Sequence, residues 1–547
     1  MTRIFKLLLA QRGLNENFLH PNYAELFDPL LMRDMKVAVG RIEQAKQRGE
    51  KIVIHGDYDV DGVTASTLLS EALVDFGCQK PEIILPDRFV DGYGMHTTVI
   101  PKIKKMGAKL VITVDCGSGS EEIIAKLAAA GIDTIVTDHH EIPQLPKTAV
   151  AVINPKRADE TYGSDLAGVG VAFMLARALN MAKNQAKNCD GQEKWWLDLV
   201  AIGTICDSMQ LTGDNRVLVY WGLKVLAKTR RPGLKELAKC AGIDLAKIDA
   251  HAVGFQIGPR LNAAGRMQTA NLALHLLLAK DRSEAVVLAD KLDELNKERR
   301  KTQDAAVTEI GAGVDLAQPV IMAHGAWHEG IVGIIAGRLM EAYQKPAFVF
   351  SELEDGIYKG SGRSFGDFSL AAALANFDAD KLISGGGHAL ACGLTIKSDD
   401  FSCFEQSVET YYLGLSLKNQ QKYLLKKSDI KLQDLSELTV ELYDEIEQLA
   451  PFGNGNPEPI FEIDAKIKAR KILKDKHLSL MITDKDGRTC KLIAFFAPTE
   501  WLTSDSSQAR MQFTLSKNEW NGMTNIEGIL INLEPIGLTE NNLEETY

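Results

Sequence analysis

The stretch KIVIHGDYDVDGVTASTLLSEALVDFG, residues 51–77, determines the fold of the first half of the chain. An apolar, β-branched run is followed by three aspartates and then by a stretch with helical spacing. Two similar runs, KLVITVDCG from Lys109 and DTIVTDHH from Asp133, are separated by the helix-like SEEIIAKLAAAG. Alternation of strand and helix at this pace predicts a parallel sheet with crossover helices. EIILP (82–86) and TAVAVINP (148–155) are predicted to add two strands.

The remainder of the chain predicts a second α/β lobe and a β-rich end. Residues 281–310 have leucines at helical spacing and contain no proline or glycine, so we expect one long helix joining two lobes. PVIMAH, GIVGIIAGRLMEAY and PAFVF then form a strand, a helix and a strand. After the connector PFGNGNPEP (451–459), two predicted hairpins, the second turning at Asn521-Gly522, indicate a small barrel.

Composition limits the classes of function. The chain has 547 residues, of which 45% are hydrophobic and 25% charged, as is typical of folded globular proteins. The formal net charge of −11 excludes a wholly basic nucleic-acid coat protein. It leaves room for a local basic groove, and the surplus of acids suggests carboxylates gathered around metal.

Cysteine usage and hydropathy bear on location. The eight cysteines include no CxxC pair, which argues against a zinc ribbon or finger. Scattered cysteines and the lack of a secretory leader lead us to expect a reducing cytoplasm. No window of 18 apolar residues occurs, so we expect no membrane span.

Acids and histidines follow the predicted strands. The carboxyl ends of parallel strands share one edge of the sheet, where ligands bind. We therefore expect these sequence-distant residues to converge. They are Asp57, Asp59 and Asp61 after the first strand, Asp115 after the second, Asp138, His139 and His140 after the third, and Asp207 after the amphipathic WWLDLVAIGTIC.

The expected clustering of so many carboxylates requires a physical explanation. Like charges a few ångströms apart repel one another, and divalent cations remove the conflict. Hard oxygens with one or two imidazoles suit Mn²⁺ or Mg²⁺ better than zinc. Two such ions, about 4 Å apart, can activate water and stabilise a phosphoryl transition state. A single aspartate after a strand is more often a turn former or a helix cap, but that explanation does not account for the whole set.

The motifs HGDYDVDG, VDCG and DHH, with the later Asp207, resemble those of the DHH phosphoesterase superfamily. GSGRS (360–364) and GGGH (385–388) resemble the DHH-associated domain. PFGNGNPEP, the terminal barrel and GPRLNAAGRM (258–267) make the whole order similar to the RecJ family of single-strand-specific 5′→3′ exonucleases. The first motif or DHH alone would not separate that family from pyrophosphatases or oligonucleotide phosphodiesterases.

The resemblance implies a domain order. It comprises an N-terminal helical segment (1–45), a DHH catalytic domain (46–230), a connecting region with the long helix (231–315), a second α/β domain that binds substrate (316–420), and a connector with an oligonucleotide-binding (OB-like) barrel (421–547).

The resemblance also implies two divalent metal ions, Mn²⁺ or Mg²⁺. His55 and Asp57 both lie in the first motif, which leaves open which of them is a ligand; we favour Asp57. Asp115 is expected to bridge the ions, His140 to face the substrate phosphate, and Asp138 to orient a neighbouring histidine. The implied metal ligands are Asp57, Asp59, Asp61, Asp115, His139 and Asp207.

Substrate contacts are expected mainly from the second lobe. GSGRS is expected to be a loop whose Ser361, Ser364 and Arg363 hold a terminal phosphate. GGGH would present His388 at the rim or form a tight turn without a function, and WHEG (327–330) would start a helix or contact the substrate. The remaining implied contacts are Arg260, Asn262 and Arg266 in GPRLNAAGRM, and, with weaker support, Arg88 in LPDRFVDGYG.

The barrel carries a local basic run. Lys466, Lys468 and Arg470 are followed by Lys471, Lys474 and Lys476, and strand spacing is expected to place several of them on one face. The run is either a solvated face or a track for a single strand; the resemblance to an oligonucleotide-binding fold favours the track.

The resulting prediction is a metal-dependent 5′→3′ exonuclease that acts on single-stranded DNA in repair and recombination and releases 5′-mononucleotides. The alternatives are an oligoribonuclease or cyclic-dinucleotide phosphodiesterase, and a catalytically inactive scaffold. The family implies a helicase and a single-strand-binding protein as partners, and we expect a monomer.

Overall fold

The computed structural model describes residues 1–92, 94–142, 144–184, 191–315, 317–415, 427–474, 476–520 and 523–536. The chain divides into two compact units. The barrel unit consists of Met1–Leu26, Gln210–Thr212 and Lys426–Tyr547, and the two-sheet unit of Phe27–Met209 and Gly213–Leu425. No helix of the described ranges is long and apolar enough to cross a membrane.

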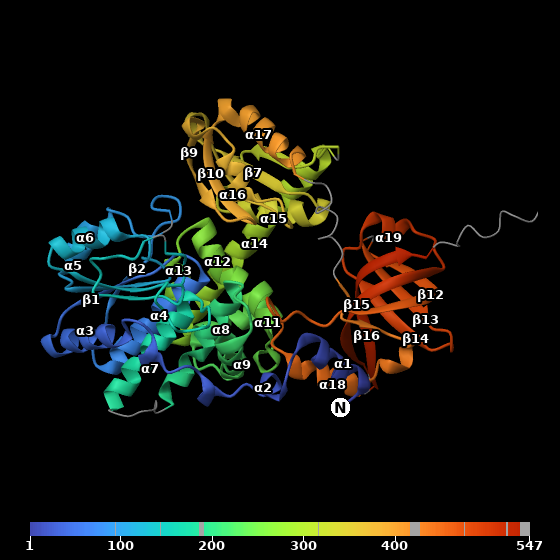
Figure 1. The fold of residues 1–547 in the computed structure, drawn as a ribbon, viewed down its shortest axis with the longest axis horizontal. Coiled ribbons are helices and arrows are strands. Elements are labelled where there is room, and N and C mark those ends of the chain that lie inside the picture. The colour runs from blue at the N-terminus through green and yellow to red at the C-terminus, as the bar shows by residue number, and fades with distance from the viewer. Residues whose placement is uncertain are drawn as a thin grey trace, which may run out of the picture. The chain divides into compact units, whose positions relative to one another are not determined.

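The first sheet of the two-sheet unit is parallel, as predicted, with strand order β2-β1-β3-β4-β5. The side chains of β1 and β3 are all buried, which explains their unbroken apolar runs. Helices α5 and α6 cover one face, and α3, α4 and α7 lie on the other (Figure 1). The elements are α3 (Met35–Arg48), β1 (Ile52–His55), α4 (Val60–Phe76), β2 (Glu82–Ile84), α5 (Val99–Met106), β3 (Leu110–Val114), α6 (Glu121–Ala129), β4 (Asp133–Thr137), β5 (Ala151–Ile153) and α7 (Gly168–Asn184).

A helical region follows the sheet and ends in the predicted long helix. Helix α14 runs through 32 residues from an N-cap at Asp281, whose side chain accepts a hydrogen bond from the N–H of Glu284. A π-helical turn, Val253–Ile257, precedes α12. The helices are α8 (Leu197–Cys206), α9 (Gly213–Leu226), α10 (Pro232–Ala241), α11 (Ala250–Ala252), α12 (Gly258–Met267), α13 (Asn271–Leu278) and α14 (Arg282–Gly313).

The second sheet is mixed, with order β6-β7-β8-β10-β9; only β6 and β7 pair in parallel. Its core contains Phe348, Phe350 and Phe404, whose side chains are fully buried. The elements are β6 (Ile321–Gly325), α15 (Val332–Tyr343), β7 (Ala347–Glu352), β8 (Ile357–Arg363), α16 (Leu370–Ala375), β9 (Leu382–Gly387), β10 (Ala391–Lys397) and α17 (Phe401–Leu413).

The expectation that GSGRS forms a loop is wrong, because Gly360–Arg363 belong to strand β8. The glycines provide space for the core rather than a turn. A Cβ atom on Gly360 would lie 2.4 Å from the ring of Phe350, and one on Gly362 would lie 2.8 Å from that of Phe348. Both distances are far below van der Waals contact.

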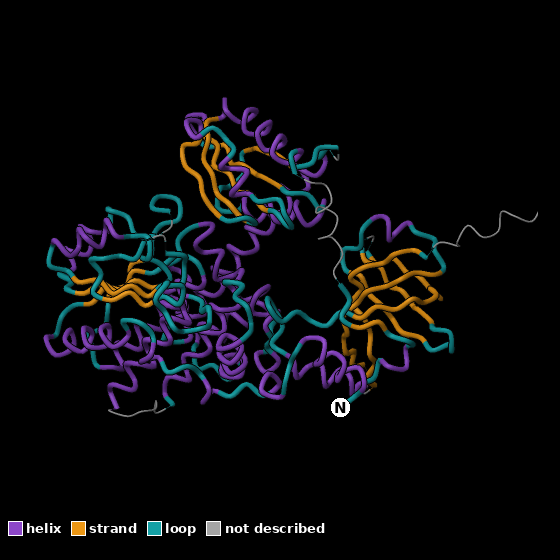
Figure 2. The backbone as a smooth tube through the Cα atoms, viewed as in Figure 1, coloured by secondary structure: helices purple, strands orange, loops and turns teal. Residues whose placement is uncertain are grey.

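The barrel unit contains a closed barrel of five strands, β12-β13-β14-β16-β15, with β15 pairing back to β12 and β11 beside β12 (Figure 2). The predicted turn at Asn521-Gly522 lies outside the described residues. The elements are β11 (Ile430–Lys431), α18 (Val440–Ile446), β12 (Phe461–Leu473), β13 (His477–Thr483), β14 (Thr489–Ala494), α19 (Thr499–Thr503), β15 (Gln508–Trp520) and β16 (Met523–Pro535).

The N-terminal segment 1–45 does not form a separate domain but is divided between the two units. Helices α1 (Arg3–Arg12) and α2 (Glu16–Leu19) belong to the barrel unit, whereas α3 belongs to the two-sheet unit. The apolar face of α1, with Phe5 and Leu8 fully buried, shares one core with barrel residues such as Phe461 and Phe513. Burial of this face against the barrel explains why the division falls near residue 26 instead of 45.

Candidate metal centre and nucleic-acid interface

The predicted acids and histidines converge at the carboxyl edge of the parallel sheet. They form three groups, and the potential ligand atoms of each group lie within 4.8 Å of one another. The chain turns sharply here, since Asp115 has a φ of +59°, a left-handed conformation that aspartate tolerates better than most residues. The groups are Asp57, Asp59 and Asp115; Asp61, His139 and Asp207; and Asp115, His139 and His140.

The imidazole of His139 lies at the centre of the acids. Its Nε2 atom is 3.1 Å from Asp115 Oδ1, 3.6 Å from Asp207 Oδ2 and 3.9 Å from Asp61 Oδ2. Burial, with the nearby charge of His140, lowers the pKa of His139 to about 3. The ring is therefore neutral at physiological pH and has a lone pair to offer.

The carboxylates crowd one another. Burial and the charge of Asp59 raise the pKa of Asp57 well above its usual value and that of Asp61 to about 7. Burial and neighbouring aspartates also raise the pKa of Asp115 well above its usual value and that of Asp207 to about 9. These carboxyls hold protons that a cation would displace.

Asp61 is held by the start of helix α7. Its two oxygens accept hydrogen bonds from the N–H groups of Gly168 (2.6 Å) and Val169 (2.8 Å). Gly168 has to lack a side chain, because a Cβ atom there would lie 2.5 Å from the Cβ of Asp115. Our sequence reasoning did not find this contact, since Gly168 carries no chemistry and is distant in sequence.

Asp138 supports the second histidine. Its Oδ1 lies 2.8 Å from His140 Nδ1, and its Oδ2 accepts a hydrogen bond from the N–H of Ser118 (2.9 Å). Although burial opposes the charge on both groups, their mutual hydrogen bond lowers the pKa of Asp138 to about 2 and raises that of His140. Asn154, at the end of β5, donates to Ser118 Oγ and to the carbonyl oxygen of His140 (both 2.9 Å). Asn154 also follows a strand, so the rule that identified the acids could have found it.

His55 and Asp57 occupy different surroundings. Asp57 belongs to one of the three groups, whereas within the described chain His55 belongs to none. His55 is buried with Nδ1 3.7 Å from the thiol of Cys116, and burial lowers its pKa to about 4. The geometry thus favours Asp57 as the first-motif ligand.

These donors fit hard divalent cations. Asp57 Oδ1, Asp115 Oδ1 and His139 Nε2 are buried and make no hydrogen bond within the described ranges. Buried polar atoms normally have partners, so three such atoms in one place indicate that something binds them. Carboxylate oxygens with one or two imidazoles suit Mn²⁺ or Mg²⁺.

Three arginines of the two-sheet unit lie near one another. Arg88, Arg266 and Arg363 form no ion pair with any described carboxylate; Arg88 packs over the Tyr58 ring, 5.1 Å from its centroid. Burial and the charge of Arg88 lower the pKa of Arg266 to about 9, and burial is the main cause of the lowered pKa of Arg363. Uncompensated guanidinium groups suit a phosphate. We call Arg88, Arg266 and Arg363 the arginine cluster.

The other predicted contacts of α12 differ from Arg266. Arg260 donates to Asp293 Oδ1 and to the carbonyl oxygen of Gln256, both at 2.8 Å, so it is committed to an ion pair with α14. Asn262 is half-buried and lies four residues before Arg266, on the same face of the helix. Geometry therefore supports Asn262 and Arg266 as phosphate contacts more than Arg260.

The GSGRS and GGGH motifs lie on either side of strand β10 in the second sheet. Gly362 in β8 and Gly387 in β9 pair with opposite sides of Cys392 in β10. Arg363 donates to Ser361 Oγ (3.0 Å), and His388 is exposed beside the end of β9. Ser364, by contrast, is buried and donates to the carbonyl oxygen of Phe368 (2.8 Å).

The basic run of the barrel does not share one face. A bulge in β12 between Ile467 and Ala469 shifts the alternation of side chains, which corrects the expected spacing. Lys466 and Lys468 are exposed. Arg470 pairs with the buried Leu480 and donates to the carbonyl oxygens of Trp501 (2.8 Å) and Ser504, which anchors the end of α19.

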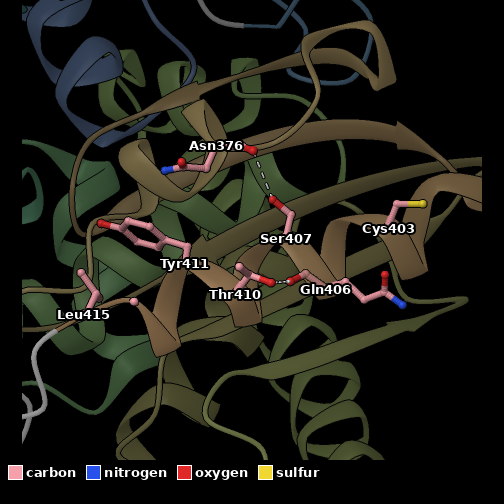
Figure 3. Close-up of a pocket in the computed structure, with 8 residues that line it drawn as sticks. Asn376, Cys403, Gln406, Ser407, Thr410, Tyr411 and Leu415 are labelled. Atoms are coloured by element: carbon pink, nitrogen blue, oxygen red, sulfur yellow. Dashed lines mark hydrogen bonds between the residues drawn. The ribbon is translucent and has the colours of Figure 1, made fainter.

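A pocket of about 530 Å³ lies along α17, lined by residues such as Asn376, Cys403 and Tyr411 (Figure 3). Ser407 donates to the carbonyl oxygen of Asn376 at 3.3 Å, and Thr410 donates to that of Gln406 at 2.7 Å. None of the predicted site residues lines this pocket. Its lining mixes polar and apolar side chains, and none of the groups of potential metal ligands found in the described part of the chain lies there.

Comparison with known proteins matches three families in sequence order. The DHH family N-terminal domain matches residues 51–204, the DHHA1 domain residues 316–412, and the RecJ OB domain residues 429–532. These matches agree with the parallel sheet, the mixed sheet and the closed barrel.

Individual relatives match over most of the chain. The single-stranded-DNA-specific exonuclease RecJ of Escherichia coli is 34% identical, with 91% of this chain and 90% of the relative covered. The RecJ of Bacillus subtilis is 36% identical over 89% of this chain, which spans 62% of that relative's length. The crystal structure of Thermus thermophilus RecJ in complex with Mn²⁺ superposes with a TM-score of 0.84 at 28% identity, covering 97% of this chain and 76% of that one.

Proposed function

The chain belongs to the RecJ family of single-stranded-DNA-specific exonucleases, and from this premise we propose that it hydrolyses single-stranded DNA from the 5′ end and releases 5′-mononucleotides. The observation that carries the proposal is the convergence of three groups of metal-ligand atoms at one sheet edge. The arginine cluster of the same unit supplies positive charge for the substrate phosphates.

We assign the metal-binding role to Asp57, Asp59, Asp61, Asp115, His139 and Asp207. Two divalent cations held there would supply an activated water and stabilise the charge that develops on the phosphoryl group. The helix α7 amides fix Asp61, so that its ligand oxygens are preorganised.

His140 has a separate role in the proposal. Its ring is partly exposed, and Asp138 holds its Nδ1 atom, which leaves Nε2 directed away from that bond. The raised pKa favours the protonated ring, which donates a hydrogen bond to a non-bridging phosphate oxygen. Asp138 keeps the ring oriented through its hydrogen bond with Nδ1.

The arginine cluster explains why hydrolysis would start at the 5′ end of a strand. A metal centre cuts a phosphodiester without distinguishing the two ends of a strand, so another group has to bind the terminus. Arg363, with Ser361 and Arg88, has the donors to bind a 5′-terminal phosphate, and a guanidinium can hold two of its oxygens at once. An anchored 5′-phosphate would fix the distance to the first scissile bond.

Several expectations stay predictions. They are the helicase and single-strand-binding protein as partners, the monomeric state and the cytoplasmic location. The closed barrel favours the exonuclease over an oligoribonuclease or cyclic-dinucleotide phosphodiesterase, because barrels of this class bind extended single strands.

The test is an assay on single strands labelled at either end, with Mn²⁺ and with EDTA. We expect a 5′ label to appear at once as a mononucleotide and a 3′ label to remain on gradually shortening strands. The same sequence as a blunt duplex should resist. Release of a 3′ label first, or activity in EDTA, would contradict the proposal.

A further inference from the structure

The segment between β6 and α15 contacts the surroundings of all three arginines of the cluster. It contains the WHEG motif (327–330), for which the sequence indicated either a helix start or a substrate contact. Helix α15 begins at Val332, so the motif leads directly into the helix. Three guanidinium groups repel one another, so other groups have to hold them together. The contacts of this segment identify those groups.

Gly330 packs against Arg266 at the end of α12. A Cβ atom on Gly330 would lie 2.1 Å from the backbone oxygen of Arg266, so only glycine permits this approach. The Nη1 atom of Arg266 in turn donates to the carbonyl oxygen of Gly330, with 3.4 Å between nitrogen and oxygen. The backbone and the side chain of Arg266 therefore both contact the same glycine.

Gly333, in the first turn of α15, packs closely against Arg363. A Cβ atom on Gly333 would lie 3.0 Å from Arg363 Nη2 and 3.0 Å from Ser361 Oγ. Ser361 Oγ also accepts a hydrogen bond from Arg363 Nη1 (3.0 Å). The start of α15 therefore limits where the Arg363 guanidinium group can lie.

His328 links this segment to the loop that carries Arg88. Its ring packs edge-on against the ring of Phe89, with 5.2 Å between the centroids and 89° between the planes. Phe89 follows Arg88 directly, and the N–H of Phe89 donates to Asp87 Oδ1 (2.8 Å), which holds the loop in its turn. Edge-to-face contacts of this kind are attractive and define how the two rings are oriented.

The His328 ring is oriented by its own turn. The N–H of Gly330 donates to His328 Nδ1 (3.1 Å), so this nitrogen offers the lone pair and Nε2 carries the proton. The side chain is exposed, so these contacts do not result from burial in a core. One imidazole thus joins Phe89 on one side to Gly330, which contacts Arg266, on the other.

We propose that His328 is a positioning residue, which holds the loop of Arg88 at a fixed distance from the other two arginines, so that the cluster meets a terminal phosphate as one unit. The inference rests on the proposed function, in which the arginine cluster binds the 5′-terminal phosphate. His328 acts through Arg88 and does not itself touch the strand. A misplacement of about 1 Å can slow a reaction by about a hundredfold, so a residue outside the phosphate site can influence the rate.

The test measures kcat/KM of the full-length chain in Mn²⁺ on single strands that differ only in a 5′-phosphate or a 5′-hydroxyl. In His328→Ala we expect a loss of about tenfold on the phosphorylated strand and within about twofold on the hydroxyl strand, because only the first presents a terminal phosphate to the cluster. His324→Ala is the matched control, since His324 is also exposed but its Nδ1 lies 2.7 Å from Glu352 Oε1. It should cut both strands like wild type.

Two conservative variants separate the contacts of the ring. His328→Asn keeps an oxygen that accepts a hydrogen bond from the N–H of Gly330, and His328→Phe keeps a ring edge for Phe89. Each should lose about threefold on the phosphorylated strand, less than His328→Ala loses. All three variants should melt like wild type, because the substituted side chain is exposed.

The double variant Arg88→Ala/His328→Ala shows whether His328 acts through Arg88. Without Arg88 the loop has no guanidinium group to position, so the second substitution should cost at most about twofold on the phosphorylated strand. A further loss of about tenfold would mean that His328 contacts the strand itself. An equal loss on both strand types in His328→Ala, or no loss on either, would mean that His328 only shapes the turn. Each of these three results would overturn the proposal.

Failure of the proposed function would give a different pattern. Wild type would then cut both strand types equally well, or Arg88→Ala would cut the phosphorylated strand as fast as wild type, whatever the His328 variants do.

Discussion

The two-sheet unit contains two groups of like charges, the aspartates around Asp115 and the arginine cluster. The two groups differ in how the repulsion between their members can be relieved. Near neutral pH the aspartates around Asp115 can take up protons, because the pKa values of Asp61 and Asp207 are raised to about 7 and about 9. The arginine cluster cannot lose its charge in that range, since even the lowered pKa of Arg266 is about 9. Protons therefore compete with cations at the first group, whereas only an anion relieves the second.

The largest expected effect is loss of hydrolysis in Asp115→Asn. Asparagine keeps the size of aspartate and tolerates its left-handed backbone, but the carboxylate shared by two ligand groups is removed. We expect turnover to fall by a factor of at least about 1,000, as for residues that hold catalytic metals. Binding of single strands in EDTA should remain, because the arginine cluster is intact. Turnover within tenfold of wild type would exclude a bridging role for Asp115.

The arginine cluster is tested by Arg363→Ala on strands with a 5′-phosphate or a 5′-hydroxyl. A hydrogen bond to a charged group contributes about 1.5–3 kcal/mol, so the phosphorylated strand should be cut about tenfold to a hundredfold more slowly. The hydroxyl strand should lose much less, because it never makes the contact.

Arg260→Ala is the matched control for this comparison, since Arg260 is ion-paired with Asp293. It should affect both strand types alike. An equal loss on both strands in Arg363→Ala would instead assign that arginine a structural role within its sheet.

A smaller effect concerns the metal-free protein. A carboxyl whose pKa is raised by folding stabilises the fold at low pH, and that stability is lost as the pH rises through the raised value. Without metal, wild type should therefore lose stability as the pH rises from about 4, where these carboxyls ionise in the unfolded chain, to about 7 for Asp61 and about 9 for Asp207. Asp115→Asn removes one of the crowded carboxylates, so the metal-free variant should lose less stability than wild type over the same pH range.

Thermal unfolding in EDTA measures this difference. At pH 8.5 we expect the variant to melt about 2–4 °C above wild type, the shift that about 1 kcal/mol produces in a domain of 150–250 residues. The difference should shrink at pH 5 and reverse when Mn²⁺ is added. A variant less stable than wild type in EDTA at both pH values would show that repulsion among the carboxylates is not the main effect of Asp115 on the stability of the metal-free fold.

The contrast between the two groups also explains how much the sequence could predict. Except for Asp207, which follows helix α8, each acid follows a strand, and the shared edge of a parallel sheet then brings these acids together whatever their separation in sequence. No comparable sequence rule predicts where arginine side chains come together. Arg260 and Arg266 lie on one helix, and only the fold reveals that Asp293 pairs with the first, whereas the second has no ion pair among the residues that the structure describes.

Other features depend on packing that has no local signal. GSGRS resembles a loop in composition, but its glycines provide space for Phe348 and Phe350 in a strand. Phe495 and Phe496 continue an apolar run in the sequence, and nothing in that pattern distinguishes an exposed ring from a buried one. The contact of Gly168 with Asp61 links residues 107 positions apart.

The central claim is that the acids and His139 bind two divalent cations in place of protons. Calorimetric titration of the metal-free chain with Mn²⁺ at pH 7, in buffers of different ionisation enthalpy, gives the number of ions bound and the number of protons released. We predict two ions per chain, release of at least one proton, and weakened binding with less proton release in Asp115→Asn. Binding of Mn²⁺ without proton release, and with the same affinity in Asp115→Asn, would contradict the account.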